Sequence, residues 1–164
     1  MDKAAYCYPV EHYDYWKKEL PSWKFDSSAF GENFATEGMA EDSIHVGDTF
    51  SLGSANVVVT QPRMPCYKLG IKFQADDMVR RFLASGRTGF YVAVVREGDV
   101  GAGDEIKSIT WDSNAVSISE ITHLYVAKNY GEAEIHSARR ALRVAALPDI
   151  WKEHFRERLR QAQA

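Results

Sequence analysis

The chain has little of what marks several classes of protein. It contains only two cysteines, Cys7 and Cys66, too few for the disulfide framework of a small secreted domain. Its 20 basic and 23 acidic residues give a formal net charge of −3, so no basic footprint exists for nucleic acid or an anionic membrane. No apolar run approaches the roughly 20 residues that span a bilayer, and the start Met1-Asp2-Lys3 lacks the apolar core of a signal peptide. We therefore expect a cytoplasmic protein whose partners include neither a membrane nor a nucleic-acid polymer.

Apolar residues supply the material for a sizeable core. They make up 45% of the 164 residues, which excludes a disordered chain and fits one domain, or one domain with a small helical appendage. Aromatic residues gather unusually close to the start, at Tyr6, Tyr8, Tyr13, Tyr15 and Trp16. Such a run is typical of an element that lies inside a fold.

The first two thirds of the chain is predicted to be rich in strands. The β-branched run 55–60 (ANVVVT) predicts a strand buried on both faces, and residues 89–95 predict a second buried strand. The other predicted elements are a helix over 11–20 ended by Pro21, a loop over 27–38, short strands within 43–52 around a turn at Gly47-Asp48, a helix over 76–84 stopped by Ser85-Gly86, a turn-rich connection over 98–103 and a strand over 105–109.

After about Asp112 the pattern changes to helix. Ser117 and Glu120 have the spacing of a capping box, in which a hydroxyl and a carboxylate satisfy free amides at a helix start. Three apolar stripes at helical spacing follow, at Ile121, Leu124 and Tyr125, at Ile135, Ala138, Leu142 and Ala145, and at Trp151, Phe155 and Leu159. We therefore predict an α+β fold that is mainly β, with a strand-rich domain over 1–112 and a three-helix domain over 113–164.

The segment 61–69 (QPRMPCYKL) is the strongest candidate for chemistry. It places Cys66 after a buried strand and behind two prolines that end the strand and stiffen the connection. Arg63 and Lys68 flank this cysteine, and positive neighbours favour the thiolate, the form that attacks electrophiles and ligates soft metals. The alternative is that Cys66 is a small buried apolar residue, the usual fate of a free cysteine.

Other polar residues give weaker signals. The loop Gly31-Glu32-Asn33 is either a tight turn whose asparagine bonds a ligand or an ordinary loop with an exposed carboxylate. The five histidines lack the close pairing of a zinc site, so we interpret them as surface or helix residues. The glycines of 98–103 lack the lysine and the following helix of a phosphate loop, so we expect no nucleotide site there. The arginines from 139 on are mixed with acidic and apolar residues, which is typical of a solvated helix face.

At residues 61–69 the sequence resembles a known family. The pattern QPRxPCxKL is similar to the signature of YiiM-type MOSC domains, named after the C-terminal domain of molybdenum cofactor sulfurases. The agreement extends over nearly the whole chain, and the cysteine motif and the Gly-Glu-Asn loop are specific as a pair. The matching positions lie at 8–9, 11–13, 16, 30–33, 36, 38, 47–48, 86 and 89, followed by the three-helix tail.

The resemblance implies a β-barrel-like MOSC domain, followed by a small three-helix domain, that binds a mononuclear molybdenum cofactor of the molybdopterin type. Cys66 matches the family cysteine that ligates molybdenum. Arg63 and Lys68 are then candidates to anchor the cofactor phosphate or the pterin. Further polar contacts to the pterin or the substrate are expected from Gln61, Asn33, Glu32 and Thr36.

The activity that the resemblance implies is the reduction of N-hydroxylated compounds such as 6-hydroxylaminopurine, which is a detoxification. Because the sequence shows no flavin, iron–sulfur or nicotinamide motif, a separate electron-donor protein would have to return the electrons. Two alternatives remain open. The chain is a sulfur or cofactor carrier in which Cys66 holds a persulfide, or it is a MOSC fragment without activity of its own.

Members of this family carry about fifty further residues before the point matched by Met1, including early barrel strands and a His-Gly-Gly turn, and a sheet without those strands has an unpaired edge. The sequence then corresponds to a truncated chain, to a start at the wrong methionine or to a reduced relative. Without those strands an incomplete cofactor pocket is expected, and in the case of a reduced relative a homodimer could cover the edge.

Overall fold

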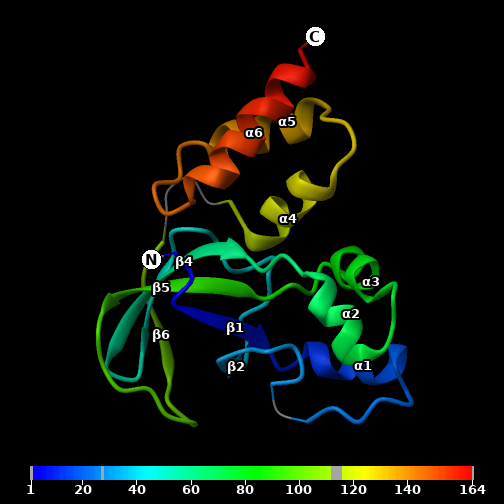
Figure 1. Cartoon of the computed structure of the whole chain (residues 1–164). Helices are drawn as coiled ribbons and strands as arrows, with labels where there is room; N and C mark the ends of the chain where they lie inside the picture. Colours follow the sequence, from blue (N-terminus) through cyan, green and yellow to red (C-terminus); the bar gives the residue numbers. More distant parts are fainter. Residues whose placement is uncertain (1, 27, 112–115, 164) are drawn as a thin grey trace.

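The computed structural model describes residues 2–26, 28–111 and 116–163. Over these ranges six strands form one curled sheet, a half-barrel with the order β2-β1-β5-β4-β3-β6 (Figure 1). β1 and β2 run parallel, and the other neighbouring strands are antiparallel. The strands are β1 (Ala5–Pro9), β2 (Phe34–Thr36), β3 (Thr49–Leu52), β4 (Ala55–Pro62), β5 (Phe90–Arg96) and β6 (Ile106–Thr110).

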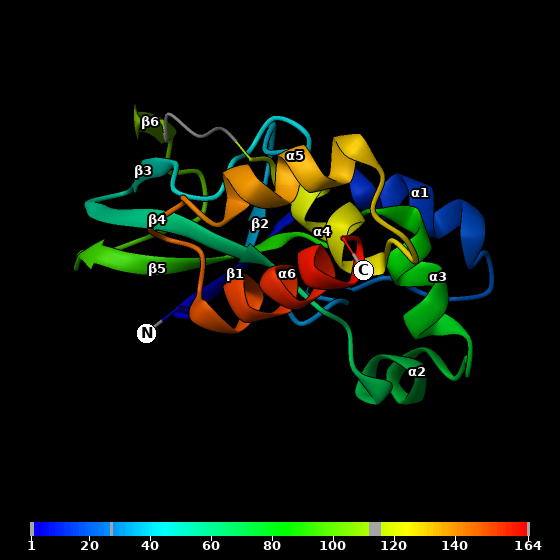
Figure 2. The ribbon, with the colours of Figure 1, turned by 90° about the horizontal axis from the view of Figure 1, so that it is seen from above.

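Helices occupy two places around this sheet (Figures 1 and 2). α1 (His12–Glu19), α2 (Tyr67–Phe73) and α3 (Met78–Ser85) gather at one end of it, while α4 (Ile118–Val126), α5 (Glu132–Ala141) and α6 (Asp149–Gln161) form a bundle over it. The predicted capping box is present, because the Ser117 hydroxyl accepts from the Glu120 amide and the Glu120 carboxylate accepts from the Ser117 amide, both at 3.0 Å. The predicted α+β fold with three C-terminal helices is confirmed.

Strand β1 separates two apolar cores. Its side chains alternate, so Tyr6 and Tyr8 enter one core and Cys7 enters the other. The first core, which we call the aromatic cluster, contains Tyr6, Tyr8, Trp16, Ala29, Phe30, Leu69, Phe73, Met78 and Phe82. The aromatic run near the chain start therefore does belong inside the fold, as its composition predicts.

The second core joins the sheet to the C-terminal bundle. We call it the sheet–bundle core, and it combines sheet residues such as Val59 and Phe90 with bundle residues such as Ile121, Leu124 and Phe155. The predicted boundary between 112 and 113 lies outside the described residues. No helix in the described ranges is long and apolar enough to cross a membrane.

Residues 27–38, predicted as a loop, contain the edge strand β2. Tyr8 pairs with Ala35 and Pro9 pairs with Thr36 in the parallel ladder with β1. The prediction is wrong for 34–36 because three residues are too few for an alternating pattern. Pairing with β1 makes residues 34–36 a strand.

Helix α2 was not predicted either. Gly70 lies in its middle, and glycine is among the weakest helix formers. The helix buries Leu69 and Phe73 in the aromatic cluster, so packing overrides the local preference.

Strand β5 is buried only in its first half, whereas the sequence predicted a buried strand throughout. Val94 and Val95 are 49% and 62% exposed, because β1 pairs with β5 only from Phe90 to Val92.

Candidate functional site

The cysteine motif connects β4 to α2. β4 ends at Pro62, and the Arg63 amide donates to the Gly89 carbonyl at 3.3 Å, which ties the start of the connection to the residue before β5. Pro65 and the extended backbone of Cys66 (φ −120°, ψ 174°) then lead into α2. Two prolines within four residues restrict this connection, so the cysteine is carried by a stiff segment.

The two cysteines have opposite environments. Cys66 is exposed, whereas Cys7 is 3% exposed in the sheet–bundle core. Burial raises the pKa of the Cys7 thiol to about 12, so this side chain stays protonated at neutral pH. The alternative that Cys66 is a buried apolar residue is therefore wrong. Of the two cysteines, Cys66 is the one available for chemistry.

Arg63 turns back over the aromatic cluster. Its guanidinium carbon lies 4.8 Å from the centre of the Tyr6 ring and 5.5 Å from that of Phe82, within the range of cation–π attraction. Among the described residues its Nη1 atom is buried and finds no hydrogen-bond partner. A buried guanidinium donor without an acceptor is unfavourable, so Arg63 offers a donor to any acceptor that reaches this point.

The Gly31-Glu32-Asn33 loop contacts the backbone of the same tyrosine. The side-chain Oδ1 of Asn33 accepts from the Tyr6 backbone amide at 2.8 Å, and the Asn33 backbone amide donates to the Tyr6 carbonyl at 2.9 Å. Glu32 is buried, and its carboxylate accepts from the Tyr13 hydroxyl and, at 3.1 Å, from the Phe30 amide. The loop is therefore anchored to β1 and α1 by the polar atoms that the sequence offered as ligand contacts.

Tyr6 is the residue that sequence reasoning did not select. Its hydroxyl donates to the Thr88 carbonyl at 2.8 Å, its backbone holds Asn33, and its ring lies under Arg63. Burial raises its pKa well above the ordinary value, although the Arg63 charge opposes the shift, so the hydroxyl remains a donor. The aromatic run at 6–16 was its only signal in the sequence.

The remaining predicted site residues lie elsewhere. Lys68 is exposed on α2 and, within the described ranges, forms neither a hydrogen bond nor an ion pair. The buried Gln61 accepts at Oε1 from the Trp151 indole at 2.8 Å and so faces the C-terminal bundle. Thr36 is buried beside Cys7 and Phe50, and its hydroxyl has no partner among the described residues. The structure thus brings Arg63 and the Gly-Glu-Asn loop together at Tyr6 and leaves Gln61 and Thr36 apart from them.

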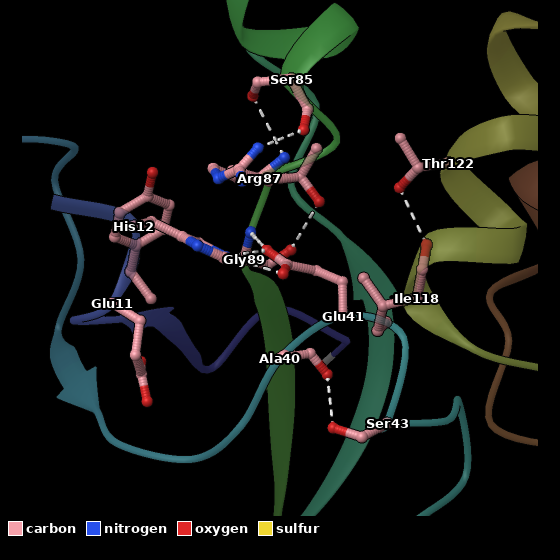
Figure 3. A network of polar contacts seen from close by, with 12 residues as sticks. Glu11, His12, Ala40, Glu41, Ser43, Ser85, Arg87, Gly89, Ile118 and Thr122 are labelled. Atoms are coloured by element: carbon pink, nitrogen blue, oxygen red, sulfur yellow. Dashed lines mark hydrogen bonds and ion pairs between the residues drawn. The ribbon is translucent and has the colours of Figure 1, made fainter. Parts of the chain in front are cut away.

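A second polar network supports the strand beside the motif (Figure 3). The Glu41 carboxylate contacts His12 Nε2 at 2.9 and 2.7 Å and accepts from the Gly89 amide at 2.7 Å. His12 lies on a helix, as predicted for the histidines, yet it is buried rather than on the surface. Because Gly89 also accepts from Arg63, this network fixes the backbone on which the motif rests. Across the described ranges no group of three or more His, Cys, Asp or Glu is arranged to hold a metal ion.

Comparisons with known proteins place this geometry in context. Residues 1–107 match the model of the MOSC domain, and residues 116–162 match that of the YiiM-like, 3-alpha helix domain. YflK of Bacillus subtilis (strain 168) is 37% identical over 155 residues, which cover 94% of this chain and 68% of that protein. Protein YiiM of Escherichia coli (strain K12) is 33% identical over 159 residues, covering 96% and 69%.

A solved structure and a more distant relative match as well. The crystal structure of YiiM from Geobacillus stearothermophilus has a TM-score of 0.89 and 35% identity, and the match covers 96% of this chain and 79% of that one. A protein named "Reductase" from Gibberella moniliformis (strain M3125 / FGSC 7600) is 28% identical over 166 residues, which are 98% of this chain and 28% of that protein.

Proposed function

Because this chain belongs to the MOSC family and carries the YiiM-like three-helix domain, we propose that it is a molybdenum-cofactor-dependent reductase of N-hydroxylated compounds. The observation that carries the proposal is that one short motif holds both an exposed thiol, on Cys66, and a buried guanidinium donor, on Arg63, that has no partner among the described residues. The MOSC family is associated with molybdenum cofactor binding in general, and one relative bears the name "Reductase".

The residues present fit such a cofactor. A cysteine thiolate is a soft ligand that suits a soft metal, and Cys66 is the exposed cysteine. The unpartnered Nη1 of Arg63 suits an anionic or carbonyl oxygen, and Lys68 adds a second, exposed cation. We therefore assign metal ligation to Cys66 and cofactor anchoring to Arg63 and Lys68.

The polar loop acts differently in this proposal. Glu32 and Asn33 already use their carboxylate and amide oxygen within the protein. The role of Asn33 is therefore to hold Tyr6 beneath Arg63, and that of Glu32 is to fix the loop to Tyr13. Gln61 faces the bundle and serves the substrate side. Thr36, beside Cys7, is the predicted contact that the geometry supports least.

The proposed reaction converts a hydroxylamine and two protons and two electrons into an amine and water. When bound, the cofactor would supply the two-electron redox chemistry that cleavage of the N–O bond requires. The protein holds that centre through Cys66 and positions it through Arg63, and a separate electron-donor protein returns the two electrons. The substrate that we propose is 6-hydroxylaminopurine.

Elemental analysis tests the proposal directly. Protein from cofactor-replete cells is expected to contain near-stoichiometric molybdenum, which the Cys66→Ala variant loses and the Cys7→Ala control keeps. The metal-loaded protein is expected to reduce 6-hydroxylaminopurine with reduced methyl viologen as donor. Full activity in Cys66→Ala would overturn the assignment.

The exposed thiol also suits a sulfur carrier, so one measurement must separate the two functions. Cyanide-labile sulfur on Cys66, in protein that contains no molybdenum, supports the carrier function. Molybdenum without labile sulfur supports the reductase.

A further inference from the structure

A pocket of about 310 Å³ lies between the end of β4 and the C-terminal bundle. Its size is at the lower end of the range for small-molecule sites, about 300 to 1,000 Å³. The bundle contributes Tyr125, Ile150, Trp151 and His154, and the first domain contributes Lys3, Gln61, Pro62 and Met64. Neither domain alone forms this pocket.

The bundle wall is aromatic. The Tyr125 ring lies 5.3 Å from the Trp151 ring and 5.0 Å from the His154 ring. Tyr125 lines the pocket and remains 42% exposed, so part of this residue is accessible to a ligand. Grouped rings with an open face favour a flat, unsaturated ligand, which gains stacking in addition to burial.

The polar groups of the pocket complement this wall. The Trp151 indole holds Gln61 at Oε1, which orients the amide and leaves its Nε2 group as a donor for a ligand. The Nε2 atom of His154 is buried and, in the described part of the molecule, has no hydrogen-bond partner. Burial, and secondly the Arg158 charge, lowers the pKa of His154, so the imidazole is neutral at pH 7 and can accept or donate.

The charge of the lining excludes one class of ligand. No carboxylate is among the described lining residues, and Lys3 is the one permanently charged side chain there. A cationic ligand would therefore lose its hydration without gaining an ionic partner. An anionic ligand can pair with Lys3, and a neutral ligand has less hydration to lose.

We infer that this pocket binds a planar heteroaromatic molecule, neutral or anionic, whose ring stacks against Tyr125 and whose polar edge meets Gln61 and His154. Met64 lines the pocket, and two residues of chain span at most about 7 Å between Cα atoms, so the Cys66 Cα lies within about 7 Å of the Cα of a residue in the pocket wall. The three-helix domain thereby supplies the specificity of the site. The connection to Cys66 rests on the proposed function, while ring binding does not.

Isothermal titration calorimetry on the full chain without metal tests ring binding. The probes are adenine and 6-carboxypterin, which separate a purine from the ring system of the cofactor, with benzamidine as a cationic ring of small size. Saturable binding of either heteroaromatic probe, with benzamidine much weaker, supports the inference. Binding of neither, or equal binding of benzamidine, overturns it.

Two variants place the bound ring. Tyr125→Ala and His154→Leu are each expected to weaken the bound probe about tenfold, because one stacking surface or one hydrogen bond is lost. His154→Leu should leave the midpoint of thermal unfolding unchanged or higher, since it removes a buried atom without a partner. The controls Trp111→Ala and His136→Leu, which replace exposed residues outside the pocket, should bind normally. Unchanged affinity in both test variants would contradict the site.

The same preparations distinguish this inference from the proposed function. Ring binding without any molybdenum uptake leaves the inference standing and removes the reductase. Molybdenum uptake without ring binding leaves the reductase standing and removes the inference.

Discussion

The guanidinium carbon of Arg63 lies 4.8 Å from the centre of the Tyr6 ring, and the Tyr6 amide donates to Asn33 at 2.8 Å. The cation of the cysteine motif and the polar loop therefore meet on one residue of β1, although they are far apart in the sequence. This arrangement explains why Arg63 is half-buried while one of its donors has no partner among the described residues. The contacts of the guanidinium with the Tyr6 and Phe82 rings hold it in place, and that donor is left for a ligand.

Replacing Arg63 should separate binding from stability. Arg63→Met removes a cation–π contact that contributes about 1 kcal/mol and a buried unsatisfied donor that costs about as much. The free energy of unfolding in urea is therefore expected to change by less than about 1 kcal/mol, while the molybdenum content of the purified protein falls at least several-fold. Arg80→Met, at an exposed arginine of α3, is the matched control and should change neither quantity. A fully loaded Arg63→Met protein would show that Arg63 is not an anchor.

The two thiols should differ in reactivity. At pH 8 one thiol per chain is expected to react rapidly with a disulfide reagent, and Cys66→Ala should abolish this fast phase. Cys7 has a pKa of about 12 because it is buried, so it lies almost entirely as the unreactive thiol and should react only after unfolding. The chromophore released before urea is added counts the fast Cys66 thiol, and the further amount released in urea counts the Cys7 thiol. Two fast thiols in the native protein would contradict the burial of Cys7.

Two glycines with similar φ angles should respond differently to alanine. Gly89 has φ +60°, and an added Cβ would lie 2.4 Å from the Cys7 carbonyl oxygen. Gly86 has φ +66°, and nothing lies within 4 Å of its added Cβ. Gly86→Ala is expected to cost about 1 kcal/mol from backbone strain alone, and Gly89→Ala at least about 3 kcal/mol because β1 and β5 must separate. Urea unfolding of both variants measures the difference, and equal losses would show that β1 shifts easily.

The Glu41 carboxylate should be important for stability and not for binding. Glu41→Ala leaves His12 Nε2 and the Gly89 amide without their partner in a buried site, for which a loss of about 3 to 5 kcal/mol is expected. Glu41→Gln keeps one acceptor and should lose less. The exposed neighbour Glu37→Ala serves as control and should be neutral. If Glu41→Ala unfolds like the parent protein, water must replace the carboxylate.

The sequence by itself determined the elements whose signals are local. The capping box at Ser117, the helix stop at Gly86 and the β-branched strand over 55–60 depend on a few consecutive residues, whose backbone preferences suffice. The cysteine motif also identified the family. By contrast, β2 and α2 depend on their packing partners, and neither was predicted.

Only the tertiary structure decided which polar groups remain available at the site. It buried Cys7 and exposed Cys66, engaged Glu32 and Asn33 within the protein, and set Tyr6 beneath Arg63. It also joined Gln61 to Trp151 across 90 positions of sequence and so created the pocket between the two domains. These contacts arise where a curled sheet brings distant segments together, and no preference of neighbouring residues encodes them.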